Sequence, residues 1–142
     1  RGAYHFFLAT KNGYDQAQNF IQSVKLEAGD LPPVLDIEHL YGVSADSMRA
    51  RLMVWIKTVK KHYGVDPIIY TNVKFYQKHL AGFVDQYPVW VAHYLQKEKP
   101  RIERQWQFWQ HSEKGKVFGI RTRVDFNVFN GTSGQFEQLL IQ

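Results

Sequence analysis

Two carboxylates stand two residues apart in an otherwise apolar run, LPPVLDIEH at residues 31–39. If this run is a β-strand, successive side chains alternate between its two faces, so Asp36 and Glu38 share one face. Leu35 and Ile37 then share the other face. Acids near a strand end can cap a helix or pair with a base, but a carboxylate inside an apolar strand is costly without a partner or a task. Asp36 and Glu38 are therefore candidate functional residues.

This pair has the residue types that glycoside hydrolysis requires. Two ionised carboxylates about 6 Å apart, at an effective dielectric constant near 20, repel by roughly 3 kcal/mol, or about two pKa units. One of them is therefore expected to keep its proton near neutral pH. A protonated acid can donate to the leaving oxygen while an ionised neighbour stabilises positive charge at the sugar carbon. The backbone spacing of about 6.6 Å leaves both the retaining and the inverting route open.

The composition is that of one globular domain. The chain has 142 residues, of which 44% are hydrophobic and 22% are charged, enough for a real core. It has no cysteine, which excludes disulfides and thiolate sites and fits a bacterial product. The net charge of +5 favours an acidic partner, but the basic residues are scattered and no nucleic-acid-binding motif accompanies them. No apolar run is long enough to span a membrane.

Strand-like and helix-like segments alternate along the chain, which predicts an α/β fold with a parallel sheet and right-handed crossovers. The strands are expected at residues 3–9, 32–39, 66–71, 87–94, 105–112 and 123–129. Helices are expected at residues 14–29, 44–63, 73–82 and 133–142, with Gly29 ending the first and Ser44 and Gly64 bounding the second.

Parallel sheets place their chemistry at the carboxyl ends of the strands. Polar residues fall at that end of each predicted strand after the first: Glu38, His39, Thr71, Asn72, His93, Tyr94, Gln110, His111, Asp125 and Asn127. We therefore expect these side chains to meet at one edge of the sheet.

Aromatic residues make up 15% of the chain, and sugar rings stack on such side chains. Most of them are expected to fill the space between sheet and helices. The candidates for substrate contact are Tyr70 and Tyr94, which stand at strand ends and carry a hydroxyl, together with Tyr4, Trp90 and Asn127.

Other chemistries find little support. His5, His39 and His93 lie in or beside strands, but neither H-x-H nor H-E-x-x-H occurs, and we expect no metal site. No glycine-rich phosphate loop follows a strand and no G-x-S-x-G elbow is present, so no cofactor and no serine-esterase chemistry are expected.

Six short motifs resemble glycoside hydrolase family 25 lysozymes, the Chalaropsis-type N-acetylmuramidases. In chain order they are RGAYHFF, PPVLDIE, PIIYTN, PVWVAHY, WQFWQHS and VDFNVFNG. Each motif is short, but the ordered set covers almost the whole chain. The resemblance implies an irregular, TIM-like β/α barrel that cleaves the β-1,4 bond between N-acetylmuramic acid and N-acetylglucosamine in peptidoglycan.

The resemblance also implies roles for single residues. Glu38 matches the general acid/base, and Asp36 matches its companion, acting as nucleophile or by orienting the substrate's N-acetyl group. Asp125 matches a supporting acid of the active site, and Tyr4 and Tyr70 match tyrosines that line the sugar site. Retention of configuration is what the family implies.

The chain departs from the family pattern at its start. Two expected strands, the first with a G-x-D-x-S-like stretch, have no counterpart, so about six of the eight barrel strands are present. We therefore expect residues 1–142 to be one truncated catalytic domain of a longer muramidase, which intact mass of the native product would test. Its open sheet edges invite self-association; edge pairing or a loss of activity is expected, and a fully active monomer would contradict this.

Two further functions stay open. The first is non-catalytic binding of cell-wall glycan by an inactive barrel, and the second is a metal hydrolase on the same fold. The expected partner is the glycan strand of peptidoglycan, with no nucleic acid and no membrane span, and the expected location is extracellular or the cell envelope.

Overall fold

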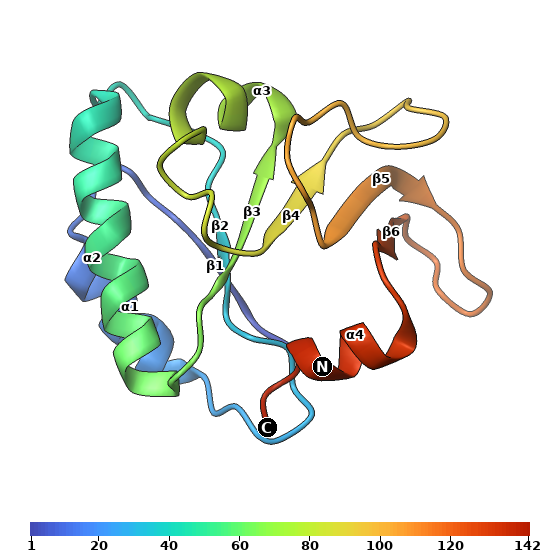
Figure 1. Ribbon diagram of the computed structural model, residues 1–142, viewed down its shortest axis with the longest axis horizontal. Coiled ribbons are helices and arrows are strands. Elements are labelled where there is room, and N and C mark those ends of the chain that lie inside the picture. The colour runs from blue at the N-terminus through green and yellow to red at the C-terminus, as the bar shows by residue number, and fades with distance from the viewer.

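The computed structural model describes all residues from 1 to 142, built around one six-stranded sheet. The spatial order is β1-β2-β3-β4-β5-β6, so each strand pairs with its neighbours in the sequence. The sheet curls like part of a barrel wall and stays open between β1 and β6 (Figure 1), which confirms the incomplete β/α barrel. The strands are β1 (Tyr4–Phe6), β2 (Val34–Asp36), β3 (Ile68–Asn72), β4 (Val89–Ala92), β5 (Phe108–Gly115) and β6 (Val124–Phe129).

The pairing is parallel from β1 to β5, as expected, but the prediction of a wholly parallel sheet is wrong for the last strand. β6 runs antiparallel to β5, and only residues 116–123 connect the two. A parallel crossover needs a dozen or more residues, whereas a short loop returns the chain as a hairpin. Gly119, with φ of 88°, lies in this turn.

Helices α1 (Gly13–Ser23) and α2 (Ala45–Tyr63) pack against each other on one face of the sheet (Figure 1). The main hydrophobic core lies between them and the strands. Leu35 and Ile37 are fully buried in it, against α2 residues such as Leu52 and Trp55. The predicted alternation along residues 34–38 is therefore confirmed for Leu35 and Ile37, which face the core.

Local capping decides where the predicted helices end. Ser44 caps α2 through its side chain, which accepts the Ser47 N–H, and Gly64 ends the helix with φ of 76°, as expected. The first helix was predicted to reach Gly29, but α1 ends at Ser23 because Val24 is already extended. Gly29 instead serves a separate turn, with φ of 89°.

The third predicted helix, residues 73–82, is a short α-helical turn followed by a π-helical segment. These are α3 (Val73–Phe75) and η1 (Tyr76–Leu80), and the Ala81 N–H bonds to the carbonyl of Tyr76, five residues back. Such π-helical turns are rare and occur often at functional sites.

The last helix, α4 (Ser133–Leu139), covers the amino end of the barrel interior. Its residues Phe136 and Leu139 pack on the cluster formed by Val34, Ile68 and Phe108, the first residues of their strands. The helix was predicted to run to residue 142, but it ends at Leu139. The backbone of Ile141 instead bonds to Gly29 and Asp30. None of the helices combines the length and apolar character that a membrane crossing requires.

Candidate active site

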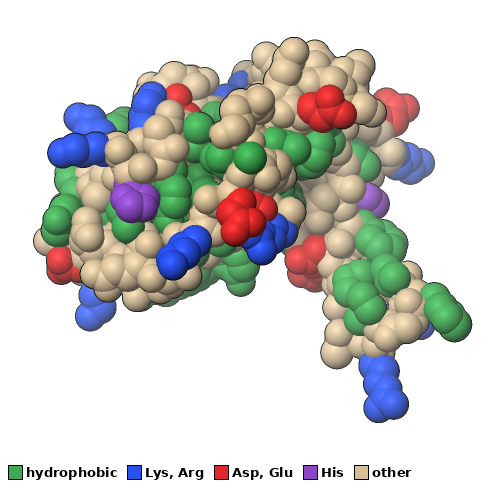
Figure 2. All heavy atoms as spheres, turned by 90° about the horizontal axis from the view of Figure 1, so that it is seen from below, with side chains coloured by type: hydrophobic (Ala, Val, Ile, Leu, Met, Phe, Trp, Pro, Cys, Tyr) green, Lys and Arg blue, Asp and Glu red, His purple; other side chains and the backbone are tan.

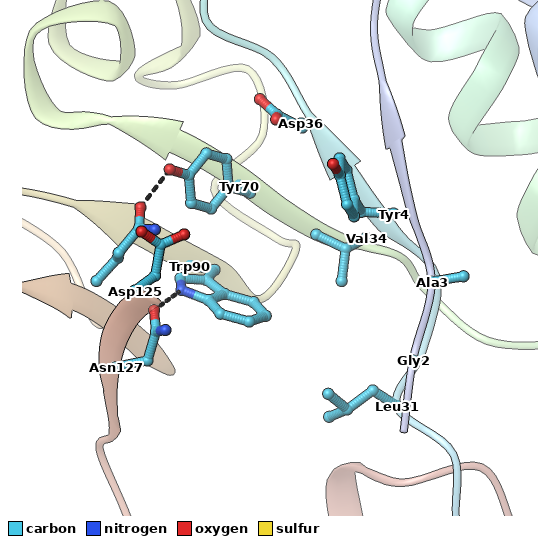
Figure 3. A pocket seen from close by; sticks show the side chains of 11 residues that line it. Gly2, Ala3, Tyr4, Leu31, Val34, Asp36, Tyr70, Trp90, Asp125 and Asn127 are labelled. Atoms are coloured by element: carbon cyan, nitrogen blue, oxygen red, sulfur yellow. Dashed lines mark hydrogen bonds between the residues drawn. The ribbon is translucent and has the colours of Figure 1, made fainter. Parts of the chain in front are cut away.

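A hollow of about 410 Å³ lies on the inner face of the sheet, and Figure 3 shows the side chains around it. We call it the first hollow. Strand register explains its floor, because Asp36 of β2 is level with Tyr70 of β3, and Tyr70 is level with Trp90 of β4. Its lining residues are Gly2, Ala3, Tyr4, Leu31, Val34, Asp36, Tyr70, Trp90, Gln110, Asp125 and Asn127.

Asp36 is the most strongly perturbed acid of this site. Burial, and secondly the negative charge of Glu38, raise its pKa from 3.8 to about 7. Its Oδ1 atom is fully buried and has no hydrogen-bond partner, so ionisation there lacks the usual compensation. The expectation that one acid of the pair keeps its proton near neutral pH is met by Asp36. Its main cause is burial, however, and not the repulsion on which the sequence argument relied.

Glu38 lies two residues beyond the end of β2 and is held by Asn72. The Nδ2 atom of Asn72 donates to Oε2 of Glu38 at 3.2 Å. The orientation of this amide is fixed, because its Oδ1 accepts the Phe75 N–H at 2.9 Å and thereby caps α3. The strand-to-helix turn after β3 therefore aims a hydrogen-bond donor at the carboxylate of Glu38.

Glu38 lines a second hollow of about 420 Å³, separate from the first. The two hollows share a ridge made by two tyrosines and one glutamine. The hydroxyl groups of Tyr70 and Tyr94 both donate to Oε1 of Gln110, the latter at 3.2 Å. Burial, followed by the charge of Glu38, raises the pKa of Tyr70, with a smaller contribution from Asp36. Both acids therefore act electrostatically on the same tyrosine hydroxyl.

The opposite wall of the first hollow comes from β6 and β1. Trp90 Nε1 donates to Oδ1 of Asn127 at 2.8 Å, which ties β4 to β6 across β5, and Asp125 stands exposed beside them (Figure 3). Tyr4 of β1 is 69% exposed, so its ring is available to a ligand. Aromatic and polar side chains from β1, β3, β4, β5 and β6 thus line the hollow that contains Asp36.

The first hollow brings together six of the eight predicted site residues: Tyr4, Asp36, Tyr70, Trp90, Asp125 and Asn127. Glu38 and Tyr94 line the second hollow instead. Sequence reasoning placed Asn72 and Gln110 at strand ends but assigned them no part in the site. Their signal was the run of polar residues at the carboxyl edge.

The histidines have separate surroundings. His5 stacks on Trp55 at 5.7 Å in the helix layer, where burial lowers its pKa, and its Nε2 contacts Gln16. His93 Nδ1 accepts the Arg101 N–H at 3.0 Å. No three or more His, Asp and Glu side chains are grouped as a metal site would require.

The basic residues do not gather into a patch on the face shown in Figure 2, where lysine and arginine side chains are spread among apolar and polar ones. Several are paired with acids, as in Lys60 with Asp66 at 2.7 Å and Arg1 with Asp30 at 2.9 Å. On this face the positive charge is thus dispersed and forms no continuous patch.

Comparison with known proteins identifies a family for the chain. A family model described as glycosyl hydrolases family 25 matches residues 1–120. The uncharacterized protein YegX of Escherichia coli K12 is 48% identical over 132 residues, which are 93% of this chain and 48% of YegX. Lysozyme M1 of Streptomyces globisporus is 34% identical over 154 residues, covering 95% of this chain and 51% of that protein.

Solved structures give the same result. A family 25 glycosyl hydrolase from Bacillus anthracis superposes with a TM-score of 0.86 at 33% identity, covering 96% of this chain and 67% of that one. The chain spans about half the length of the curated relatives it matches. The extent of the family match and the shared fold together show that the chain belongs to glycosyl hydrolase family 25.

Proposed function

We propose that this chain is a peptidoglycan hydrolase that cleaves the β-1,4 bond between N-acetylmuramic acid and N-acetylglucosamine. The observation that carries the proposal is the placement of Asp36 and Glu38 at one edge of the sheet, each on the wall of a hollow. Family membership and the similarity to Lysozyme M1 support it. A substrate of this kind places the protein in the cell envelope or outside the cell.

The two acids divide the chemistry. Glu38 donates a proton to the leaving oxygen, and Asp36 faces the sugar carbon, where positive charge develops. In the free protein, burial raises the pKa of Asp36 to about 7. Positive charge developing beside Asp36 favours its ionised form, so Asp36 is a carboxylate when the bond breaks.

The remaining residues of the first hollow bind and orient the sugar. Tyr4, Tyr70 and Trp90 offer ring faces and edges for the apolar faces of the pyranose. Asn127 and Asp125 provide polar groups on the β6 side. This division of labour suits a polymer of N-acetylated sugars, which has both apolar ring faces and hydrogen-bonding substituents.

The test is Glu38→Gln, which preserves shape but removes the transferable proton. General acid catalysis by a positioned side chain contributes about a hundred-fold to ten-thousand-fold, so turnover of purified cell walls should fall by that factor. Affinity for the insoluble substrate, measured by pull-down, should be retained. Glu103→Gln is the matched control, because Glu103 is exposed and lines neither hollow.

The same turnover and binding measurements distinguish hydrolysis from non-catalytic glycan binding. A wild-type chain that binds cell walls without releasing reducing ends, and a Glu38→Gln variant that binds equally well, would establish a binding protein. Loss of turnover on adding a chelator would point to a metal hydrolase and contradict the two-carboxylate mechanism.

A further inference from the structure

The second hollow has no role in the function proposed above beyond presenting Glu38. It lies at the carboxyl ends of β2, β3 and β4, and its outer wall is the α3–η1 turn. Its volume of about 420 Å³ matches that of the first hollow, about 410 Å³. Its lining residues are Glu38, Asn72, Val73, Lys74, Gln77, Ala92, His93 and Tyr94.

The two hollows meet at the ridge where the Tyr70 and Tyr94 hydroxyls share the Gln110 oxygen. Tyr70 and Gln110 line the first hollow, and Tyr94 lines the second. A polymer that crosses this ridge places one unit in each hollow. The bond between the two units then lies between Asp36 on one side and Glu38 on the other.

The reaction chemistry determines which end of the glycan strand lies in which hollow. The acid must stand beside the oxygen that departs, because that oxygen takes its proton as the bond from C1 breaks. Water then supplies a hydroxyl to C1 and returns a proton to the acid. Since Glu38 lies in the second hollow and Asp36 in the first, the departing unit belongs in the second hollow.

The walls of the second hollow suit a hydroxylated, amide-bearing ligand. Three of its eight lining residues are hydrophobic, whereas six of the 11 lining the first hollow are. Lys74 of α3 and Gln77 of η1 are exposed. Neither side chain takes part in an ion pair or hydrogen bond within the chain, so their polar ends are available to a ligand.

We propose that the second hollow receives the leaving N-acetylhexosamine and the glycan strand attached to it, with Lys74 and Gln77 as its contacts. This inference rests on the proposed hydrolysis and adds the direction in which the glycan lies. Asn72 links the two functions, since one amide group holds both Glu38 and the turn that carries Lys74.

The experiment compares two substrates that share the first hollow and differ in the second. One is a peptidoglycan glycan strand, and the other is the 4-methylumbelliferyl glycoside of an N-acetylglucosaminyl-N-acetylmuramic acid disaccharide, whose leaving group is no sugar. The double variant Lys74→Ala/Gln77→Ala should lose about ten-fold in kcat/KM on the strand, the effect of losing one or two hydrogen bonds. Turnover of the aryl glycoside should be unchanged.

Lys78→Ala is the matched control, because Lys78 is exposed on the same π-helical segment and lines neither hollow. It should match the wild type on both substrates. Equal losses on both substrates in the double variant, or wild-type kinetics on the strand, would overturn the assignment of the leaving side. A wild-type chain that cleaves neither substrate would instead refute the hydrolase itself.

Discussion

Replacing Asp36 by asparagine should make the stability of the fold less sensitive to pH. Folding raises the pKa of Asp36 from 3.8 to about 7, chiefly through burial. The folded protein therefore binds this proton more tightly than the unfolded chain does. The resulting stabilisation is complete below pH 3.8 and is lost as the pH rises through about 7.

The size of the effect follows from the shift of about 3 pKa units, each equivalent to about 1.4 kcal/mol. The upper limit is thus about 4 kcal/mol, and solvent that reaches the half-buried carboxyl group reduces it. Asparagine has nearly the same shape and never ionises. Relative to the wild type, the Asp36→Asn variant should therefore gain stability with rising pH, by at most about 1.4 kcal/mol per pH unit between the two pKa values.

Urea unfolding followed by tryptophan fluorescence, in steps across this pH range, measures the difference directly. Glu38→Gln should show a shallower decline than the wild type, because it removes the second cause of the raised pKa. Glu103→Gln controls for the loss of one exposed carboxylate. A difference between Asp36→Asn and wild type that is constant with pH, or that shrinks as the pH rises, would refute the assignment of the proton to Asp36.

Two further substitutions test the supports of the site and of the helix layer. Asn72→Asp keeps an acceptor for the Phe75 N–H but turns a second carboxylate toward Glu38, so the pH optimum of turnover should move upward. Its unfolding midpoint should stay close to that of Asn72→Ser. Equal pH optima in the two variants would contradict the hydrogen bond from Asn72 to Glu38. Gly13→Ala should cost about 3 kcal/mol in urea unfolding, because its Cβ would lie 2.0 Å from the Arg51 carbonyl oxygen. Gly134→Ala, with nothing within 4 Å, should be neutral or stabilising, and a similar cost at both positions would contradict the close approach of α1 and α2.

Features set by neighbouring residues could be predicted from the sequence. Both ends of α2 follow from Ser44 and Gly64, because an N-cap hydroxyl and a left-handed glycine act within one helical turn. The burial of Leu35 and Ile37 follows from strand alternation. The grouping of the polar residues at the carboxyl ends of β2, β3 and β4 follows from the parallel pairing of these strands. Asp125 and Asn127 belong to the antiparallel β6, so parallel pairing does not account for their position.

Features set by the tertiary structure could not be predicted from the sequence. The direction of β6 depends on the hairpin loop before it, and the apolar pattern of β6 itself resembles that of a parallel strand. The raised pKa of Asp36 depends on how deeply the curled sheet buries its Oδ1 atom, which no local pattern records. The division of Asp36 and Glu38 between two hollows depends on the ridge built by Tyr70, Tyr94 and Gln110.

The most direct test of the account is the chemical identity of the sugar at the newly formed reducing end. Purified peptidoglycan is digested with this chain, the products are reduced with borohydride, and the terminal alditol is identified by mass spectrometry. Cleavage with Glu38 beside a departing N-acetylglucosamine predicts that muramitol, from N-acetylmuramic acid, forms in the wild type and not with Glu38→Gln. Glucosaminitol as the new terminus, or muramitol formation that persists in Glu38→Gln, would contradict it.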